Sequence, residues 1–540
     1  MKIKILGLLL LASTSIFAQK KKVELTKPKL VVGIVVDQMR YDYLYRFYDK
    51  YSDNGLKRLM NDGFNCRNNH YHYASTVTGP GHAHIYTGSS PAISGIVGNE
   101  WHDKVENKDH YVVDDSTVNI VGDGRPNNGK MSPNNLKVTT ITDQLRIASQ
   151  FNSKVIGVAI KDRGSILPAG HTGMAYWYDA YSGNWITSDY YQKELPTWVT
   201  KFNAQKLPET YIAKGWETLR PIESYVETEA DDQPYEATIS GEPKAVFPHK
   251  ITMASIASSY YGNELTKKFA LAAFDAENLG RGAYTDFLAV SFSTPDYVGH
   301  AFGPQSKEIE DVYIRFDLDI AEILNHLDAT LGKGTYSVFL SADHGVAEIP
   351  SFLRKHNINS GLFTGSDMQK KAEAALVAKF GEGKYIEASD NYQLYLNHKT
   401  LKSKKLTTTD ALEAVKEVLE KEDGIYTVVD ISKGDFGSIP TYYKEKLNTI
   451  YNPKRSGELM VLVEPAWFSG YTKGTTHGTM YAYDTHVPLL LYGWGIKKGE
   501  TTKNTYISDI APTIAQLLKI LEPNGNIGKP VSEALKKSKK

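Results

Sequence analysis

Apolar, β-branched runs recur along the chain and are separated by longer stretches of helical periodicity. Several of these runs meet their first charged residue directly after their C-terminal end, a pattern typical of buried parallel strands. We expect strands at Leu30–Val36, Val155–Ile160, Phe287–Ser293, Ser337–Ala342 and Val487–Tyr492.

Between the runs, apolar residues repeat at the spacing of one helix face, most clearly from Ile309 to Leu331. Strands joined by helix-length connections predict an α/β fold, in which helices cover both faces of a central, mostly parallel sheet. The expected helices span Tyr41–Met60, Val138–Ala148, Ile251–Tyr261, Ile309–Leu331 and Ile510–Leu518.

Two stretches interrupt this alternation, and we interpret both as insertions that cap the central sheet. Residues 176–248 are rich in Tyr, Trp, Thr and Pro and show no sustained helical period. Residues 362–467 resemble a small α/β subdomain. Its predicted helices and strands are Lys370–Phe380, Asp410–Lys421, Gln393–Leu396 and Tyr426–Val429. We therefore expect one domain over residues 19–540 that carries two insertions.

The overall charge is balanced, with 62 Lys and Arg against 62 Asp and Glu in 540 residues. This balance gives no support for binding to nucleic acid or for electrostatic attachment to a membrane. Affinity for an anionic substrate must therefore come from a local site. We expect a monomer without stable membrane insertion.

The N-terminus predicts export. Lys2 and Lys4 precede a short apolar run, and a small residue, Ala18, stands where a signal peptidase would cut. We expect residues 1–18 to be a signal peptide and the mature protein to be periplasmic, with secretion as the alternative. The single cysteine, Cys66, excludes an internal disulfide and a thiolate metal cluster, and we interpret it as a small buried residue.

Metal-ligand residue types follow three of the predicted strands. The carboxyl ends of parallel strands meet at one edge of a sheet, so these side chains would converge in space. Oxygen and imidazole ligands in this number suit zinc, and they are enough for two ions. The alternative is that the carboxylates only cap exposed loops. The candidates are Asp37, Asp296, His300, Asp343 and His344.

A hydroxyl stands before a short predicted helix that ends near Gly88. Pro80 suits the first turn of this helix, which puts Thr78 at its N-terminus. Free N–H groups there favour an anion, and an alcohol becomes a good nucleophile when a metal ion binds it. The alternative is that Thr78 is only a capping hydroxyl.

Lys161 and Arg163 follow the strand Val155–Ile160 and, two apart in an extended chain, would point the same way. An ammonium beside a guanidinium suits a phosphoryl group, although a solvated charged turn is the alternative. Asn99 is an amide that could contact the same substrate.

His477 lies in a glycine-flanked loop that could aim its ring at a metal, and we prefer it to His486, which opens an apolar strand. Four further histidines are expected to be structural or to support ligands rather than to bind metal. They are His70, His72, His82 and His84.

This ordered set of residues resembles the alkaline phosphatase superfamily. Asn99, Lys161 and Arg163 narrow the resemblance to the phosphate-irrepressible enzymes of the PafA type. The segments from His486 to Gly495 and from Ser508 to Leu518 are similar to the closing strand and helix of that superfamily.

The resemblance implies a hydrolase of phosphate monoesters that uses two Zn²⁺ and a phosphothreonine intermediate at Thr78. Asn99, Lys161 and Arg163 would hold the phosphate oxygens. One zinc would be bound by Asp296, His300 and His477, and the other by Asp37, Asp343, His344 and the Thr78 oxygen. A third metal is not implied, because Thr replaces the usual Ser and Lys161 stands in the phosphate site.

The nearest alternative is a phosphodiesterase or nucleotide pyrophosphatase of the same superfamily, which generally lacks the Lys-x-Arg pair. A sulfatase is disfavoured because Cys66 is followed by Arg-Asn-Asn-His rather than by the motif that matures to formylglycine. A non-catalytic metal-binding protein would have no need of Thr78 and three phosphate donors.

Overall fold

The computed structural model describes residues 26–363, 365–434, 436–470 and 472–536. The predicted signal peptide, residues 1–18, lies outside the described residues. A ten-stranded sheet forms the centre, in the order β18-β2-β17-β10-β1-β9-β6-β7-β8-β5. Its strands are β1 (Leu30–Val36), β2 (Phe64–His70), β5 (Ile120–Val121), β6 (Val155–Ala159), β7 (Met174–Asp179), β8 (Asn184–Ser188), β9 (Asp286–Phe292), β10 (Ser337–Ser341), β17 (Leu489–Gly493) and β18 (Gly499–Tyr506).

The middle of the sheet is parallel. β1 pairs with β10 and β9, and β6 pairs with β9 and β7, all in the parallel sense. β17 and β8 run antiparallel to their inner neighbours. All residues of β1 are buried, as expected for a β-branched strand covered on both faces. Gly33 is needed there, because a Cβ would lie 2.5 Å from the Tyr86 hydroxyl and 2.6 Å from Phe339.

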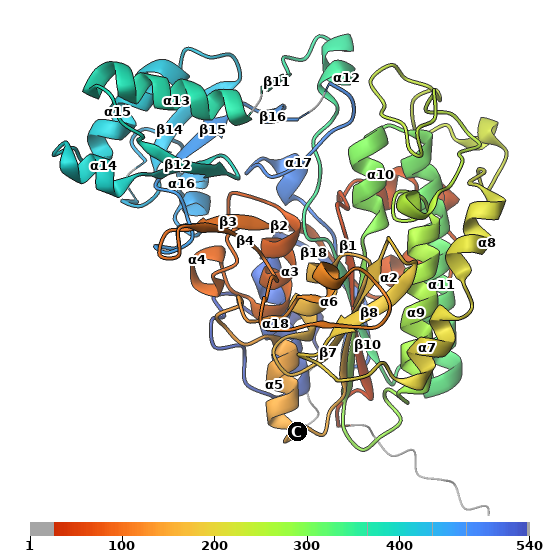
Figure 1. The fold of residues 1–540 in the computed structure, drawn as a ribbon. Helices are drawn as coiled ribbons and strands as arrows, with labels where there is room; N and C mark the ends of the chain where they lie inside the picture. The colour runs from red at the N-terminus through yellow and green to blue at the C-terminus, as the bar shows by residue number, and fades with distance from the viewer. Residues whose placement is uncertain (1–25, 364, 435, 471, 537–540) are drawn as a thin grey trace, which may run out of the picture.

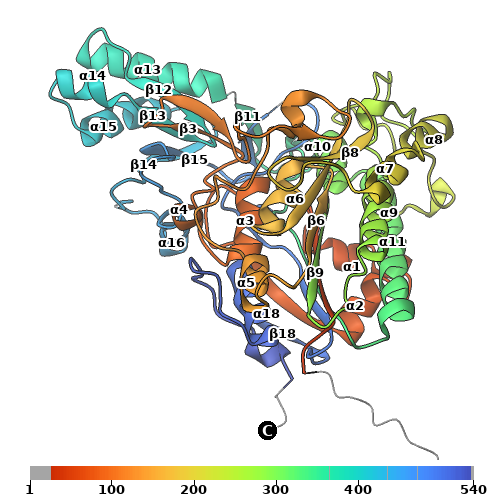
Figure 2. The ribbon, with the colours of Figure 1, turned by 60° about the horizontal axis from the view of Figure 1, so that its bottom comes forward.

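Helices cover both faces of the sheet, which confirms the predicted α/β class (Figure 1). Figure 2 shows the two helix layers from another side. One layer holds α9 (Tyr261–Ala276), α10 (Thr294–Phe302) and α11 (Lys307–Leu331), and the other holds α3 (Thr78–Thr87), α5 (Ile141–Ala148), α6 (Asp162–Ala169) and α18 (Ile510–Leu518). In the part of the chain that the structure describes, no helix has the length and apolarity to cross a bilayer.

Residues 176–248 begin inside the central sheet, since they include the end of β7 and all of β8. The remainder holds the short helices α7 (Thr197–Asn203) and α8 (Leu207–Lys214) and irregular segments beside α9 and α11.

Residues 362–467 form most of a separate lobe, in which a four-stranded sheet of order β12-β13-β15-β14 carries helices (Figure 1). β12 packs against β3 of the hairpin β3 (Glu100–Asp103) and β4 (Lys108–Tyr111). The lobe contains β12 (Ile386–Asp390), β13 (Gln393–Leu396), β14 (Ile425–Asp430), β15 (Leu459–Val463), α13 (Gly365–Phe380), α14 (His398–Ser403), α15 (Thr408–Leu419) and α16 (Thr441–Leu447), joined through the pair β11 (Gly361–Phe363) and β16 (Trp467–Ser469).

Two of the predicted helices are wrong. The segment Tyr41–Met60 is divided into α1 (Tyr43–Arg46), a 3-10 turn and α2 (Leu56–Asp62). The division falls where Asp317 accepts hydrogen bonds from the backbone N–H groups of Ser52 and Leu56 and so ends the continuous helix. The segment Ile251–Tyr261 is mostly irregular, and α9 begins only at its last residue.

Candidate active site

The predicted metal ligands meet at the carboxyl edge of the parallel strands. Asp37 directly follows β1, and Asp343 and His344 follow β10. β9 leads into α10, where Asp296 and His300 are four residues apart and therefore lie on one helix face. The topology thus brings together side chains that are more than 300 residues apart in the sequence.

Asp296, His300 and His477 form the first ligand group. The Oδ1 atom of Asp296 lies 3.2 Å from Nε2 of His300 and 3.4 Å from Nε2 of His477. His477 comes from the loop that precedes α17 (Ala482–Thr485), far from α10 in the sequence. His477 therefore joins this group from the loop in which the sequence predicted a ligand.

Asp37, Asp343 and His344 form the second group. Nε2 of His344 lies 3.4 Å from Oδ1 of Asp37 and 3.6 Å from Oδ2 of Asp343. The ring of His344 stacks on that of His477, with centroids 3.4 Å apart. The two groups are therefore in direct contact.

All three histidines are oriented by their other ring nitrogen. In each of them Nδ1 is 2.8–2.9 Å from a backbone carbonyl oxygen, so Nδ1 carries the proton and donates it. Nε2 of each ring therefore faces the carboxylates and is the nitrogen that would bind a metal ion. The carbonyls belong to Thr475 for His300, Gly345 for His344 and Thr76 for His477.

The site gathers three buried carboxylates around one ammonium group. Asp37, Asp296 and Asp343 are at most 3% exposed. Nζ of Lys161 lies 2.7 Å from Oδ2 of Asp37 and 2.5 Å from Oδ2 of Asp296. Burial lowers the pKa of Lys161, but the charges of Asp296 and Asp37 outweigh it and raise that pKa above its ordinary value.

The pKa values of the carboxylates are shifted in different directions by this environment. Burial raises the pKa of Asp37, and the nearby charge of Asp343 raises it further. Burial also acts to raise the pKa of Asp296, but His300 and Lys161 hold it well below its usual range. Burial lowers the pKa of His344 to about 3, so this ring is neutral and ready to bind a cation.

These residues fit two divalent metal ions. One buried ammonium does not balance three buried carboxylates, and an uncompensated buried charge costs several kcal/mol. Oδ1 of Asp37 and Nε2 of His344 are buried and have no hydrogen-bonding partner among the residues that the structure describes. Each group offers three nitrogen and oxygen ligands, the number that catalytic zinc sites take from a protein.

Thr78 is the first residue of α3 and is 1% exposed. His82, one turn later, donates from Nδ1 to the Thr78 carbonyl oxygen at 2.9 Å, and the same Nδ1 lies 3.3 Å from Oδ2 of Asp343. The Thr76 hydroxyl donates to the Thr479 carbonyl, whereas that of Thr78 makes no hydrogen bond within the described residues. The Thr78 hydroxyl is therefore free at the start of the helix whose Gly81 and His82 pack against Asp343.

Replacing Gly81 with alanine is expected to lower both stability and turnover. A Cβ at Gly81 would lie 2.3 Å from the Asp343 carbonyl oxygen, so α3 and the end of β10 would have to separate. Overpacking of this kind costs about 1–3 kcal/mol. Denaturant unfolding and turnover would be compared with Gly282→Ala, whose Cβ would meet nothing within 4 Å. A Gly81→Ala enzyme as stable and active as that control would contradict the close packing.

The extended geometry predicted for Lys161 and Arg163 is wrong. Lys161 is the N-cap of α6 and Arg163 lies in its first turn, because the chain turns into the helix directly after Lys161. Nζ of Lys161 lies over the Tyr297 ring, whereas the guanidinium of Arg163 lies over the Tyr111 ring. Nη1 of Arg163 donates to the Tyr111 hydroxyl at 2.9 Å.

Asn99 lies beside the N-terminus of α3. Its Oδ1 accepts a hydrogen bond from the backbone N–H of Gly79 at 2.7 Å, which orients the amide next to Thr78. With Oδ1 so engaged, the Nδ2 group is the donor available to a ligand.

Sequence reasoning missed Gln38, Tyr111 and Tyr297. Gln38 bonds carboxylates of both groups, Tyr111 bonds Arg163, and the ring of Tyr297 lies below Lys161. A glutamine or tyrosine in these positions carries no local signal. The histidines that were set aside do lie outside the two groups. His486, for example, stacks on His70 and contacts the Arg67 carbonyl.

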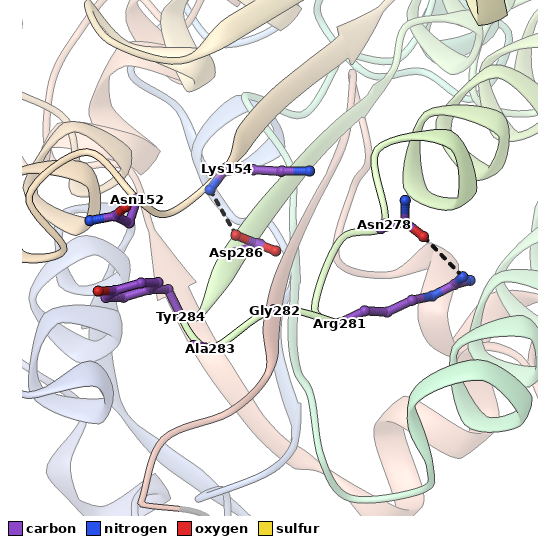
Figure 3. A pocket seen from close by; sticks show the side chains of 8 residues that line it. All are labelled: Asn152, Lys154, Asn278, Arg281, Gly282, Ala283, Tyr284 and Asp286. Atoms are coloured by element: carbon purple, nitrogen blue, oxygen red, sulfur yellow. Dashed lines mark hydrogen bonds between the residues drawn. The ribbon is translucent and has the colours of Figure 1, made fainter.

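Two other features lie away from these groups. Asp103, Glu106 and His110 could offer ligands on the β3–β4 hairpin, but this cluster is partly exposed and Lys108 already pairs with Glu106. Figure 3 shows a cavity at the opposite end of β6 and β9, where the Lys154 backbone N–H donates to Asp286. Neither feature shares a residue with the candidate site.

A family model described as type I phosphodiesterase / nucleotide pyrophosphatase matches residues 31–487. The chain is 45% identical to alkaline phosphatase PafA of Elizabethkingia meningoseptica, over 97% of this chain and 98% of that protein. It is 45% identical to alkaline phosphatase PhoV of Synechococcus elongatus, over 99% of this chain and 100% of that protein.

A protein of Myroides odoratus named calcium-transporting ATPase is 48% identical over 96% of this chain and 97% of its own. The crystal structure of wild-type PafA has a TM-score of 0.92 at 44% identity and covers 95% of this chain and 100% of its own. These matches confirm the resemblance drawn from the sequence. The chain therefore belongs to the type I phosphodiesterase / nucleotide pyrophosphatase family of the alkaline phosphatase superfamily, among the alkaline phosphatases of the PafA type.

Proposed function

We propose that the protein hydrolyses phosphate monoesters with two zinc ions and a phosphothreonine intermediate at Thr78. The observation that carries the proposal is the contact between two three-ligand groups, one of which packs against the helix that begins at Thr78. The names of the PafA and PhoV relatives support the same activity. Export to the periplasm remains part of the proposal, on the strength of the N-terminal sequence.

Asp296, His300 and His477 would hold one ion, and Asp37, Asp343 and His344 would hold the other. Bound zinc ions would supply Lewis acidity toward the phosphoryl group and would lower the pKa of a hydroxyl beside them. The His ligands are already oriented for this by their Nδ1 hydrogen bonds to backbone carbonyls.

The residues of the chain then account for two displacements at phosphorus. In the first, the Thr78 hydroxyl gives up its proton and its oxygen bonds to phosphorus, while the bond from phosphorus to the ester oxygen breaks and that oxygen takes up a proton to leave as the alcohol. In the second, water loses a proton and bonds to phosphorus, the bond from phosphorus to the Thr78 oxygen breaks, that oxygen takes up a proton and inorganic phosphate leaves. The first turn of α3 presents backbone N–H groups to the developing charge, and Asn99, Lys161 and Arg163 would hold the non-bridging oxygens.

A phosphodiesterase or nucleotide pyrophosphatase remains the second candidate, because the matching family model carries that description. The monoesterase and diesterase proposals differ in the role of Lys161 and Arg163, because a diester has one anionic oxygen fewer for these cations to hold. Comparing kcat/KM for p-nitrophenyl phosphate, its methyl diester and ATP separates them. We expect the monoester to be preferred over the diester. A preference for the diester would overturn the monoesterase proposal. The ATP arm tests whether the name of the Myroides relative describes a related activity.

Metal analysis of the pure protein is expected to return two zinc ions per chain. Removal of zinc with a chelator should abolish turnover, because the Lewis acidity that the bound ions supply would be lost. Adding zinc back should restore it. Magnesium added alone is the control. A single bound ion, or full turnover with magnesium alone, would contradict the two-zinc assignment.

A further inference from the structure

Gln38 connects the two ligand groups. It follows Asp37 directly and is 2% exposed, and its backbone has a φ of 68°. A residue other than glycine held in this left-handed region costs of order 1–3 kcal/mol, so the surrounding structure must hold it there.

The two N–H donors of Gln38 reach opposite groups. Its backbone N–H donates to Oδ1 of Asp343 at 3.1 Å, and its side-chain Nε2 donates to Oδ1 of Asp296 at 2.6 Å. The carboxylate can only accept, so the amide must present its NH₂ group to Asp296. This Asp296 oxygen is the one that faces His300 and His477.

Gly299 provides the space for this amide. It lies between Asp296 and His300 on α10, and a Cβ there would be 1.9 Å from Oε1 of Gln38. The three nearest heavy atoms to that Cβ all belong to Gln38. An alanine at position 299 would therefore displace the Gln38 amide before it meets another residue.

We propose that Gln38 is a positioning residue that orients the Asp296 carboxylate toward its metal ion. In the same proposal, position 299 of α10 must be glycine because a side chain there would displace the Gln38 amide. The inference rests on the proposed function for the presence of metal ions in the two groups. Partners that support a metal ligand in this way are typically worth a factor of about 10–100 in metal affinity or activity.

The test uses Gln38→Gly, Gly299→Ala and the double variant of the full chain. Glycine keeps the backbone N–H that bonds Asp343 and favours a positive φ, so Gln38→Gly should fold and lose only the amide. Zinc affinity is measured by competition with a chromophoric chelator, and the visible spectrum of the cobalt-substituted protein reports the geometry at the ligands. Gln144→Ala is the control, because Gln144 makes a side-chain hydrogen bond to Thr139 away from the site.

We expect Gln38→Gly to lower the affinity for one of the two zinc ions by about 10–100-fold and to alter the cobalt spectrum. The affinity for the other ion should be unchanged. Gly299→Ala should cause a similar loss alone and no further loss in the Gln38→Gly background. Gln38→Asn, whose amide is one methylene shorter, should behave as Gln38→Gly does. If Gln38 only shaped the turn, asparagine and glycine would match the wild type.

Wild-type zinc affinity in Gln38→Gly would overturn the role of Gln38. A full additional loss from Gly299→Ala in the Gln38→Gly background would overturn the role assigned to Gly299. A wild-type protein that binds fewer than two ions would instead count against the proposed function, and the Gln38 comparison would still be decided on the ion held by Asp296.

Discussion

Replacing Thr78 with alanine is expected to reduce kcat/KM for a phosphate monoester by at least about a thousandfold. Loss of a nucleophile in a preorganised site costs up to about 10⁶ in rate, and the metal ions and cations that remain would retain part of the catalysis. Thr78→Ser should keep part of the activity, because it preserves the hydroxyl at the N-terminus of α3. Steady-state turnover of p-nitrophenyl phosphate measures both effects.

The controls for this prediction are the neighbouring hydroxyls. The Thr76 hydroxyl donates to the Thr479 carbonyl, and that of Ser75 is buried with no hydrogen-bonding partner in the described part of the chain. Thr76→Ala and Ser75→Ala should therefore leave most of the turnover, and zinc content should be unchanged in Thr78→Ala. If either control inactivates the enzyme while Thr78→Ala does not, the nucleophile has been wrongly chosen.

Removing Lys161 and Arg163 together is expected to lower monoester kcat/KM by at least about a hundredfold and to leave diester turnover nearly unchanged. A charge-assisted hydrogen bond is worth about 1.5–3 kcal/mol, and each 1.36 kcal/mol of barrier is tenfold in rate. Two such bonds to the additional anionic oxygen of the monoester account for this factor. A diester carries an ester group in place of that oxygen.

The double variant Lys161→Ala/Arg163→Ala should be compared with Lys154→Ala/Arg281→Ala, a pair of the same residue types at the opposite end of the sheet (Figure 3). Zinc content must be measured in both, because Lys161 also contacts Asp37 and Asp296. Equal losses on monoester and diester with zinc intact would mean that the pair is structural and would favour the diesterase.

The positions of the ligands could be predicted from the sequence because they follow strand ends. Asp37, Asp343 and His344 each stand directly after an apolar run, and a parallel sheet brings such ends to one edge. Asp296 and His300 were chosen because they follow the strand predicted at Phe287–Ser293, whereas the helix α10 that carries both was not predicted. His477 depended on its glycine-flanked loop and on the resemblance.

Other features depend on contacts that no local pattern records. The break between α1 and α2 is held by Asp317, which lies more than 250 residues away. Gln38 occupies a left-handed position and reaches Asp296 across the site, and neither property is visible in the dipeptide Asp37-Gln38. The position of Lys161 between two carboxylates likewise follows from the packing of α6 against the sheet.

The most direct test of the central claim is to locate the phosphate on the protein during turnover. The enzyme is mixed with a labelled phosphate monoester, quenched in acid at a series of times and digested for peptide mapping. The account predicts label on Thr78, and on the serine of Thr78→Ser. Label on Ser75, Thr76 or any other side chain, or no labelled protein at any time from mixing to steady state, would contradict it.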